Sequence, residues 1–388
     1  MRITIDYTPA VHQRAGIGRY TRGLVEALAR LDSPHRFTLM VLGRAGAHYL
    51  PAGLPGNFRV RWLPLSDRWA TVLWYRLNLP LPVDWLAGPA DLYHGPSFTL
   101  PPSRCPSLLT VHDLSYLRYP QGAHPALAAW LTGAVSRSLR RARHVLADSQ
   151  NTRADLLELM HVPAPRITVV GAGVDARFQP VRDTAVLAHL RARYSLPERF
   201  ILGVSTLEPR KNFAGLIAAF GQVAGQAPPG APLHLVIAGG RGWLYEPILA
   251  AADASPLRER IHFAGYVADA DLPGLYTLAE LFVFPSAYEG FGIPVLEAMA
   301  CGTPVVCADN SSLPEVAGDA ALLVNAADTG GLAGAMSQAL NDPALRAQLV
   351  ERGFRQAARF SWDEAARRLL NVYNRLGASE NQQAIAGG

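Results

Sequence analysis

Residues 280–308 read ELFVFPSAYEGFGIPVLEAMACGTPVVCA. Two short runs rich in β-branched and aromatic residues, 280–285 and 304–308, enclose a segment with helical spacing that ends near residue 301. A strand, a helix and a second strand in this order form a βαβ unit, because parallel neighbours need a long crossover connection. The stretch therefore predicts an α/β fold with a parallel sheet.

The same alternation extends through most of the 388 residues. The strand-like runs of the first half are 2–7, 36–43, 58–63, 107–112, 144–148 and 166–170. Those of the second half are 200–205, 233–238, 260–265, 280–285, 304–308 and 321–325. This pattern is typical of doubly wound sheets, so we expect two Rossmann-like domains facing across a cleft, with a looser charged hinge at 176–198.

The C-terminal part has helical spacing. Helices are expected at 328–341, at 343–359 and at 361–376, and Ser361 followed by Glu364 has the pattern of a capping box. The predicted division of the chain is an N-terminal domain at 1–180, a C-terminal domain at 181–360, a last helix to 377 and a flexible tail at 378–388.

The composition indicates a globular chain with a mild basic surplus. It is 49% hydrophobic and 17% charged, with a net charge of +5, which suits an anionic ligand without requiring nucleic acid. The three cysteines match no zinc pattern, so reduced thiols are expected. The N-terminus lacks the features of a signal peptide and no run of about 18 apolar residues occurs, so we expect a cytoplasmic protein, at most peripheral at the inner face of the membrane.

Two glutamates in the opening stretch are candidate ligand-binding groups. Glu289 lies in a glycine-containing loop, and Glu297 follows it inside the next helix. Glycines allow a ligand to approach the backbone, and the N-terminus of a helix favours an anion. Glu297 is placed to accept hydrogen bonds from vicinal hydroxyls, and Glu289 to reach another part of the same ligand. A capping glutamate and a solvent-facing glutamate are the alternative.

Two further loops follow predicted strands and have candidate phosphate-binding residues. Arg210 and Lys211, in STLEPRKN, supply two cations that suit a diphosphate, although a solvated basic turn has the same composition. Gly16 belongs to AGIGRY at the start of the first helix. It is not part of a dinucleotide fingerprint, because Thr21 occupies the third glycine position and no acidic residue ends a second strand.

A histidine and an aspartate pair complete the candidate groups. His112 ends an apolar strand, where a histidine can donate a hydrogen bond to a sugar hydroxyl, or can be a core residue whose neighbours satisfy it. Asp269 and Asp271 have the spacing of a DxD metal motif, but we interpret them as helix caps. No metal and no cofactor is expected.

Taken together and in this order, these stretches resemble retaining GT-B glycosyltransferases with a paired-glutamate motif (glycosyl transferases group 1), including bacterial lipopolysaccharide and exopolysaccharide mannosyltransferases. The resemblance covers nearly the whole chain, and its most specific block is 287–324. Its other landmarks are EPRKN, GIGRY, TVHDLSYLRYP, ADSQNTRADL and GAGVD. It implies that the last helix packs on the first domain.

The resemblance also implies a role for each candidate. Glu289 would contact the donor hexose near its reacting carbon, His112 would contact the donor sugar, and Glu297 would hold the ribose hydroxyls. The remaining implied contacts to the base, sugar and diphosphate of the donor are Gly16, Arg210, Lys211, Tyr266, Val267, Phe291, Gly292 and Ile293. One departure is Ser205, where many members carry a further basic residue, so Arg210 and Lys211 would neutralise the diphosphate.

The implied activity is transfer of a hexose, mannose from GDP-mannose, to a glycan or lipid-linked acceptor in cell-surface polysaccharide synthesis. Retention of configuration without a metal is part of that expectation. UDP-glucose or a deoxysugar nucleotide stays open as donor, as does a sugar-nucleotide epimerase of the same fold. A nicotinamide dehydrogenase is disfavoured by the missing third glycine, and a non-catalytic scaffold would not need both glutamates and both cations.

Residues 62–86 are rich in tryptophan and leucine, with scattered arginines. A helix at 68–79 would be amphipathic, which suits peripheral contact with anionic lipid. Packing in the core of the first domain, or at an oligomer interface, explains the same composition.

Overall fold

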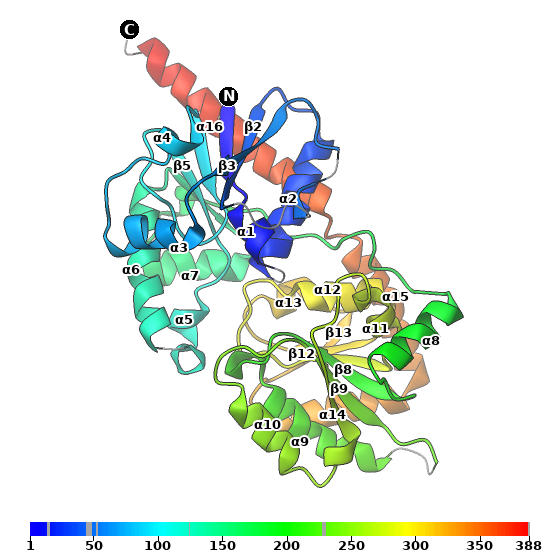
Figure 1. Cartoon of the computed structure of the whole chain (residues 1–388). Coiled ribbons are helices and arrows are strands. Elements are labelled where there is room, and N and C mark those ends of the chain that lie inside the picture. The colour runs from blue at the N-terminus through cyan, green and yellow to red at the C-terminus, as the bar shows by residue number, and fades with distance from the viewer. Residues whose placement is uncertain (14–15, 44–48, 52, 124, 227–229, 387–388) are drawn as a thin grey trace. The chain divides into compact units, whose positions relative to one another are not determined.

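The computed structural model describes residues 1–13, 16–43, 49–51, 53–123, 125–226 and 230–386 (Figure 1). The chain forms two compact units. The first consists of Met1–Leu117, Pro125–Gly173 and Ser361–Gly388, and the second of Arg118–His124 and Val174–Phe360. The change of unit follows Gly173, whereas the sequence placed it at residue 180, and the short segment 118–124 belongs to the second unit.

The first unit contains a seven-stranded parallel sheet with the order β3-β2-β1-β4-β5-β6-β7. Its strands are β1 (Arg2–Asp6), β2 (Arg36–Leu42), β3 (Phe58–Leu63), β4 (Leu92–Gly95), β5 (Ser107–Val111), β6 (His144–Ala147) and β7 (Ile167–Val169). Its helices before the crossover to the second unit are α1 (Thr8–His12), α2 (Ile17–Arg30), α3 (Asp67–Ala70), η2 (Thr71–Arg76), α4 (Asp84–Ala87), α5 (Ser115–Arg118), α6 (Pro125–Arg141), α7 (Gln150–Met160) and η4 (Ala164–Arg166).

Two elements of this unit differ from the prediction. The sequence did not predict β4, whose four residues LYHG include no β-branched side chain, although all four are buried. The sequence also did not predict α1, which has a proline in its first turn, where the missing N–H costs nothing.

The second unit contains a six-stranded parallel sheet with the order β10-β9-β8-β11-β12-β13. Its strands are β8 (Phe200–Val204), β9 (His234–Ala238), β10 (Ile261–Gly265), β11 (Leu281–Phe284), β12 (Val305–Ala308) and β13 (Ala321–Val324). Its longer helices are α8 (Thr184–Arg193), α9 (Phe213–Val223), α10 (Glu246–Asp253), α11 (Leu272–Leu278), α12 (Ile293–Ala300), α13 (Leu313–Ala317), α14 (Thr329–Asn341) and α15 (Pro343–Ala357). In Figure 1, α11, α12 and α13 lie on one face of this sheet and α9, α10 and α14 on the other. The predicted α/β architecture with two doubly wound sheets is confirmed.

The predicted hinge at 176–198 is wrong in one respect, because α8 occupies its centre. Asp183 caps this helix by accepting hydrogen bonds from the backbone N–H groups of Ala185 and Val186. Leu190 packs over Gly274, where a Cβ atom would come within 2.2 Å of its side chain. The polar composition of this segment did not indicate that Leu190 is buried and anchors α8.

The last helix, α16 (Trp362–Ala386), runs beside α2 in the first unit (Figure 1). Ser361 accepts a hydrogen bond from the backbone N–H of Glu364 at 3.1 Å, but the Glu364 carboxylate binds Arg367 and Arg368. The predicted capping box is therefore half formed. The helix also continues beyond its predicted end at 377, to Ala386.

In each sheet the strand order reverses at one position, between β1 and β4 in the first and between β8 and β11 in the second. Loops that leave the carboxyl ends of such neighbouring strands diverge to opposite faces, and ligands of open α/β sheets bind in the crevice between them. The loops that follow β8 and β11 are 205–212 and 285–292, the two stretches that carry the predicted cations and Glu289.

Candidate active site

The loop after β8 is held by backbone hydrogen bonds. Leu207 donates to Gly240 at 2.9 Å and accepts from Gly242 at 3.0 Å. One 3₁₀ turn, η5 (Pro209–Lys211), follows, and Asn212 has a left-handed backbone and caps α9 through a bond from Gly215 N–H at 3.3 Å. These constraints fix the positions from which Arg210 and Lys211 extend.

The loop after β11 is fastened to its neighbours by two serines. The Ser312 hydroxyl donates to the carbonyls of Glu289 and Phe291 at 3.0 and 2.7 Å, and the Ser311 hydroxyl accepts from the Glu289 N–H at 2.9 Å. Gly292 caps α12 with a φ of 114°, a backbone that favours glycine. The N–H of Ala287 also donates to the carbonyl of Arg210 at 2.8 Å, which joins this loop to the loop after β8.

Four charged side chains meet where these loops join. Lys211 Nζ lies 2.6 Å from one oxygen of Glu289, and Arg210 lies 3.0 Å from the other. Arg210 also lies 2.7 Å from Glu208 and donates to the carbonyl of Tyr288 at 2.6 Å. Glu208, Lys211 and Glu289 are buried, so the solvated basic turn and the capping glutamate are both excluded. Two carboxylates balance two cations in this cluster, which we call the Glu289 cluster.

The electrostatics of the cluster favour the ionised carboxylate. Burial raises the pKa of Glu289, but Lys211 and Arg210 outweigh burial and lower it to about 2. Glu289 is therefore negatively charged at neutral pH. Removing either partner of such a buried pair leaves an uncompensated charge in a poorly solvated site.

Lys211 is the only lysine in the chain, and the other strongly basic side chains are all arginine. Its ammonium is a compact point charge, which fits beside Glu289 and over the ring of Phe284 at 5.4 Å. The use of a single lysine in a chain otherwise rich in arginine therefore indicated, in addition to the motif, that Lys211 has a specific role. Glu208, also in the quoted stretch, had no predicted role, and only the structure shows that it anchors Arg210.

The other predicted donor contacts of this unit occupy several places. Glu297, on α12, is 1% exposed and accepts a hydrogen bond from the Tyr276 hydroxyl at 3.1 Å, so it is not solvent-facing. Phe291 packs edge-on against Phe360, and Gly292 and Ile293 begin α12. The structure places half-exposed Tyr266 and buried Val267 after the edge strand β10, outside the cluster.

In the first unit, His112 follows β5 and both of its ring nitrogens have partners. Nδ1 lies 2.7 Å from Asp148 Oδ2, and Nε2 lies 2.7 Å from the carbonyl oxygen of Pro96. The edges of Tyr20 and Phe98 contact the ring at centroid distances of 4.8 and 5.3 Å. Asp148 lies within ADSQNTRADL, but the sequence alone indicated no role for it. Its place at the end of β6, beside the strand that carries His112, was the signal.

Gly16 caps α2 with φ 51° and ψ −112°, a conformation that side chains rarely adopt. A Cβ atom there would meet nothing within 4 Å, so the backbone conformation and not crowding requires glycine. The predicted close approach of a ligand has the necessary open space at this residue.

The aspartates with DxD spacing differ from the expected caps. Asp271 makes no side-chain cap, and its carboxylate binds the Tyr194 hydroxyl at 2.6 Å and Arg193 at 3.0 Å. Within the described ranges no three His, Cys, Asp or Glu side chains are grouped so that they can hold a metal ion. Nor do the described helices include one that is long and apolar enough to cross a membrane.

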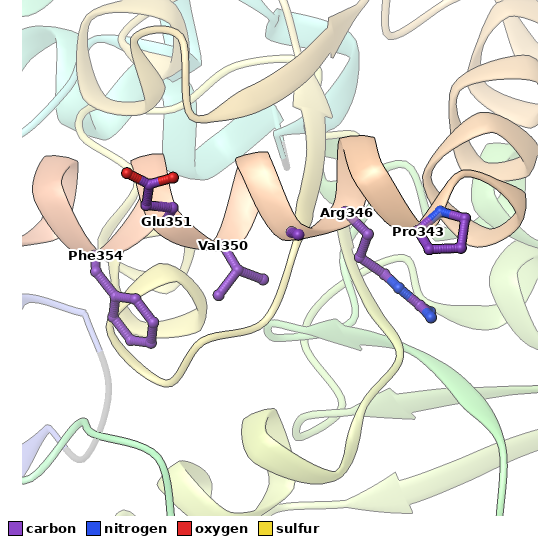
Figure 2. Close-up of a pocket in the computed structure, with 6 residues that line it drawn as sticks. Pro343, Arg346, Val350, Glu351 and Phe354 are labelled. Carbon is purple, nitrogen blue, oxygen red and sulfur yellow. The ribbon is translucent and has the colours of Figure 1, made fainter.

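A shallow cavity of about 520 Å³ lies along α15 (Figure 2). Its lining is Pro343, Arg346, Ala347, Val350, Glu351 and Phe354, all from that one helix. None of the predicted site residues contributes to it, and its surface is almost wholly apolar. The Glu289 cluster, with convergent charges at a strand-order reversal, is the better candidate for an anionic ligand.

Parallel sheets with a charged cluster at the carboxyl ends of their strands are typical of Rossmann-like α/β proteins that bind a ligand there. Family models sharpen this class. Residues 14–178 match Glycosyltransferase Family 4, and residues 191–356 match Glycosyl transferases group 1.

Relatives of known activity support the same assignment. The chain is 32% identical over 385 residues to the O-antigen chain mannosyltransferase B of Escherichia coli, which covers 97% of this chain and 100% of that relative. It is 31% identical to a D-inositol 3-phosphate glycosyltransferase of Thermobispora bispora, over 96% of this chain and 83% of the relative. The chain belongs to the glycosyl transferases group 1 family, and the predicted resemblance is confirmed.

Solved structures share the fold. A sucrose-phosphate synthase of Thermosynechococcus elongatus superposes with a TM-score of 0.75 at 23% identity, covering 98% of this chain and all of that one. HepE of Anabaena, in complex with UDP and glucose, superposes with a TM-score of 0.74 at 19% identity, covering 96% and 99%.

Proposed function

We propose that this glycosyltransferase moves mannose from GDP-mannose to a glycan or lipid-linked acceptor during synthesis of a cell-surface polysaccharide, with retention of configuration and without a metal ion. The observation that carries the proposal is the buried Glu289 cluster at the strand-order reversal of the second sheet. The choice of sugar rests on the E. coli O-antigen mannosyltransferase among the relatives.

The chemistry needs compensation of negative charge on the departing nucleoside diphosphate. Lys211 and Arg210 are cations in fixed positions, and the first N–H groups of α12 add a positive dipole end beside them. Such preorganised charge lowers a barrier because it needs no reorganisation during the reaction. Glu297, one turn into α12, is the proposed partner of the ribose hydroxyls.

Glu289 is a poor nucleophile, because two cations hold its carboxylate and its pKa is about 2. We therefore favour attack by the acceptor hydroxyl on the face that the diphosphate leaves, with a departing phosphate oxygen taking the hydroxyl proton. The new glycosidic bond forms on that face, so configuration is retained. Glu289 then acts beside the reacting carbon by its charge and its hold on Lys211.

Titration calorimetry with GDP, UDP and ADP tests the donor site without added metal. Native protein is compared with Lys211→Ala and with Arg258→Ala, which removes an arginine of the same unit that pairs with Asp253 outside the Glu289 cluster. We expect one nucleotide to bind native protein and the Arg258 variant, and binding to collapse in the Lys211 variant. Absence of binding for all three nucleotides, or equal binding by the Lys211 variant, would reject the site.

The same titration separates the donor alternatives, since UDP binding would favour UDP-glucose.

An epimerase converts its nucleotide-sugar without any acceptor. Incubating the bound donor alone and following its anomeric and ring protons by NMR distinguishes the two classes. We expect an unchanged sugar until an acceptor hydroxyl is supplied.

A second proposal concerns the segment 62–86, where the structure separates two kinds of tryptophan. Trp74 is 3% exposed and its indole donates to the carbonyl of Leu81, so it is a core residue. Trp69 and Trp85 are 61% and 64% exposed. The helix expected at 68–79 is two short pieces, α3 and the π-helical η2, ending at Arg76.

We propose that the exposed tryptophans touch an anionic membrane surface, with the neighbouring exposed arginines Arg68 and Arg76 beside phosphate groups. Co-sedimentation with vesicles of an anionic phospholipid tests this. Trp69→Ala/Trp85→Ala is expected to lose binding, and Trp243→Ala, a half-exposed tryptophan of the second unit, to keep it. Equal binding by all three proteins would contradict the proposal.

A further inference from the structure

The hydrogen bonds around His112 define which protons its ring carries. The carbonyl oxygen of Pro96 can only accept, so Nε2, 2.7 Å away, must carry a hydrogen. Nδ1 lies 2.7 Å from the carboxylate of Asp148, which also only accepts when ionised. A ring that donates from both nitrogens is an imidazolium cation.

The second oxygen of Asp148 has no hydrogen-bond partner among the described residues, so the charge of this carboxylate depends on the His112 ring. Asp148 Oδ1 and the Tyr20 hydroxyl are both buried, and neither makes a full hydrogen bond to any described residue. Burial raises the pKa of Asp148 above its usual value, and the His112 ring and the nearby Tyr20 hydroxyl limit that rise. The Tyr20 hydroxyl is a buried polar group near Asp148, and it favours the negative charge that faces His112.

The other titratable groups around the ring do not compete for its charge. His94, on β4, is neutral, because burial lowers its pKa to about 3, and its nitrogens bind Tyr373 and Thr110. Asp113, in the loop after β5, adds a weaker negative field. Burial alone would lower the pKa of His112, but the charge and hydrogen bond of Asp148 raise it above its usual range.

The ring is also fixed in orientation. Tyr20 and Phe98 touch it edge-on, and Tyr20 in turn meets the ring of Trp362, the first residue of α16, at 5.6 Å. Trp362 lies over Gly23, where a Cβ atom would come within 2.4 Å of its indole. Tyr20 on α2, Phe98 in the loop after β4 and Asp148 after β6 therefore surround one imidazole, and Trp362 of α16 supports Tyr20.

We propose that His112 is an imidazolium cation at neutral pH and that Asp148 is the positioning residue that keeps it charged. A ring with both nitrogens protonated cannot take a proton from an acceptor, so His112 is not the general base. It supplies a fixed positive charge at the carboxyl end of β5, close to the strand-order reversal of the first sheet. The charge state is a property of this chain alone, and only its effect on turnover rests on the proposed function.

Nitrogen-15 NMR of histidine-labelled protein tests the charge directly, with His112→Gln used to assign the signals. In native protein at pH 7 we expect both His112 nitrogens to have imidazolium shifts and proton couplings. Asp148→Asn is expected to give a neutral ring at that pH. Asp113→Asn, which removes a carboxylate of the same strand end without a bond to the ring, should keep the imidazolium. A neutral His112 in native protein would overturn the proposal.

The pH profile of kcat provides the functional arm. We expect the alkaline limb to move to lower pH in Asp148→Asn, and kcat above the new pKa to fall about tenfold for every pH unit by which the limb moves. Tyr20→Phe should move the alkaline limb to higher pH. Without the Tyr20 hydroxyl, the Asp148 carboxylate is more basic and accepts a stronger hydrogen bond from the His112 imidazolium. Native-like limbs in both variants would contradict the positioning role. The two proposals can fail separately. If NMR shows a charged His112 ring but the protein binds no nucleotide, the proposed function is rejected and the inference about His112 stands.

Discussion

Both units place a buried carboxylate against a cation at the carboxyl ends of parallel strands, but they constrain the pairs differently. His112 has one acceptor on each nitrogen and aromatic edges on its ring, so its partners are fixed. Glu289 is shared between Lys211 and Arg210, and the Lys211 ammonium has three donors on a flexible chain. The first arrangement keeps a charge in place, whereas the second can exchange one anion for another.

The largest effect on activity is expected when the Glu289 carboxylate, which a diphosphate can replace at Lys211 and Arg210, is removed. Glu289→Gln should lower kcat on the order of 10²-fold, because charge beside the reacting carbon is lost. It should also tighten binding of the nucleoside diphosphate by roughly tenfold, since the phosphates no longer compete with a carboxylate for Lys211 and Arg210. Steady-state kinetics and titration calorimetry measure the two effects separately.

Glu280→Gln is the matched control, because Glu280 pairs with Arg199 at 2.6 Å in the same unit but outside the cluster. It should change neither quantity. Weaker or unchanged nucleotide binding by Glu289→Gln would show that Glu289 does not compete with the diphosphate.

A smaller effect is expected when the cation changes shape and keeps its charge. Lys211→Arg places a planar guanidinium where a compact ammonium is 8% exposed between Glu289 and Phe284. We expect kcat to fall by roughly tenfold, because the fork cannot keep the same distance to Glu289. Arg241→Lys, the reverse change in the neighbouring loop, should be neutral. Full activity in Lys211→Arg would mean that charge alone matters at this position.

The two pairs should stabilise their units on opposite sides of neutral pH. The pKa of Glu289 falls from 4.5 to about 2 on folding, so its contribution is present above pH 4.5 and lost as pH falls toward 2. The depression corresponds to roughly 3 kcal/mol. The pKa of His112 is raised, so its contribution is present below its unfolded pKa and lost as pH rises through the folded value.

Urea unfolding, followed by hydrogen exchange in α12 and in α7, resolves the two contributions. The difference in unfolding free energy between native protein and Glu289→Gln should shrink between pH 6 and pH 3. The difference for Asp148→Asn should shrink as pH rises above 7. If the unfolding free energies of both variants depend on pH in the same way, the two pairs do not stabilise their units in different pH ranges.

The sequence predicted the architecture well where strands are continuously apolar. FILGV and LFVF of the second sheet were found because Val, Ile, Leu and Phe dominate them. LYHG was missed because its buried tyrosine and histidine owe their place to contacts with distant elements, such as Tyr373 on α16. The strand propensity of a short segment does not depend on such contacts, so it cannot predict a strand that they stabilise.

Prediction of the site shows the same limit. Glu289 and Lys211 were proposed as parts of one ligand site, but their direct pairing requires two loops 78 residues apart to meet. Asp148 and Glu208 received no role, since each acts through a cation whose position only the fold defines. Motifs thus identified the charged residues of the cluster better than the residues that hold them in place.

The smallest effect tests how α16 supports His112 through Tyr20. Alanine normally stabilises a helix relative to glycine by about 1 kcal/mol. Gly221 on α9 has open space around a Cβ atom, so Gly221→Ala should raise stability by up to that amount. At Gly23 on α2 the same methyl group would come within 2.4 Å of the Trp362 indole, so the ring must move. Gly23→Ala should therefore lower the unfolding free energy by roughly 1–3 kcal/mol, the usual range for overpacking. It should also release the Tyr20 edge and broaden the His112 signals in NMR. If both alanine variants raise stability, Trp362 does not pack against α2, and the imidazolium of His112 must be held by Asp148 and Pro96 alone.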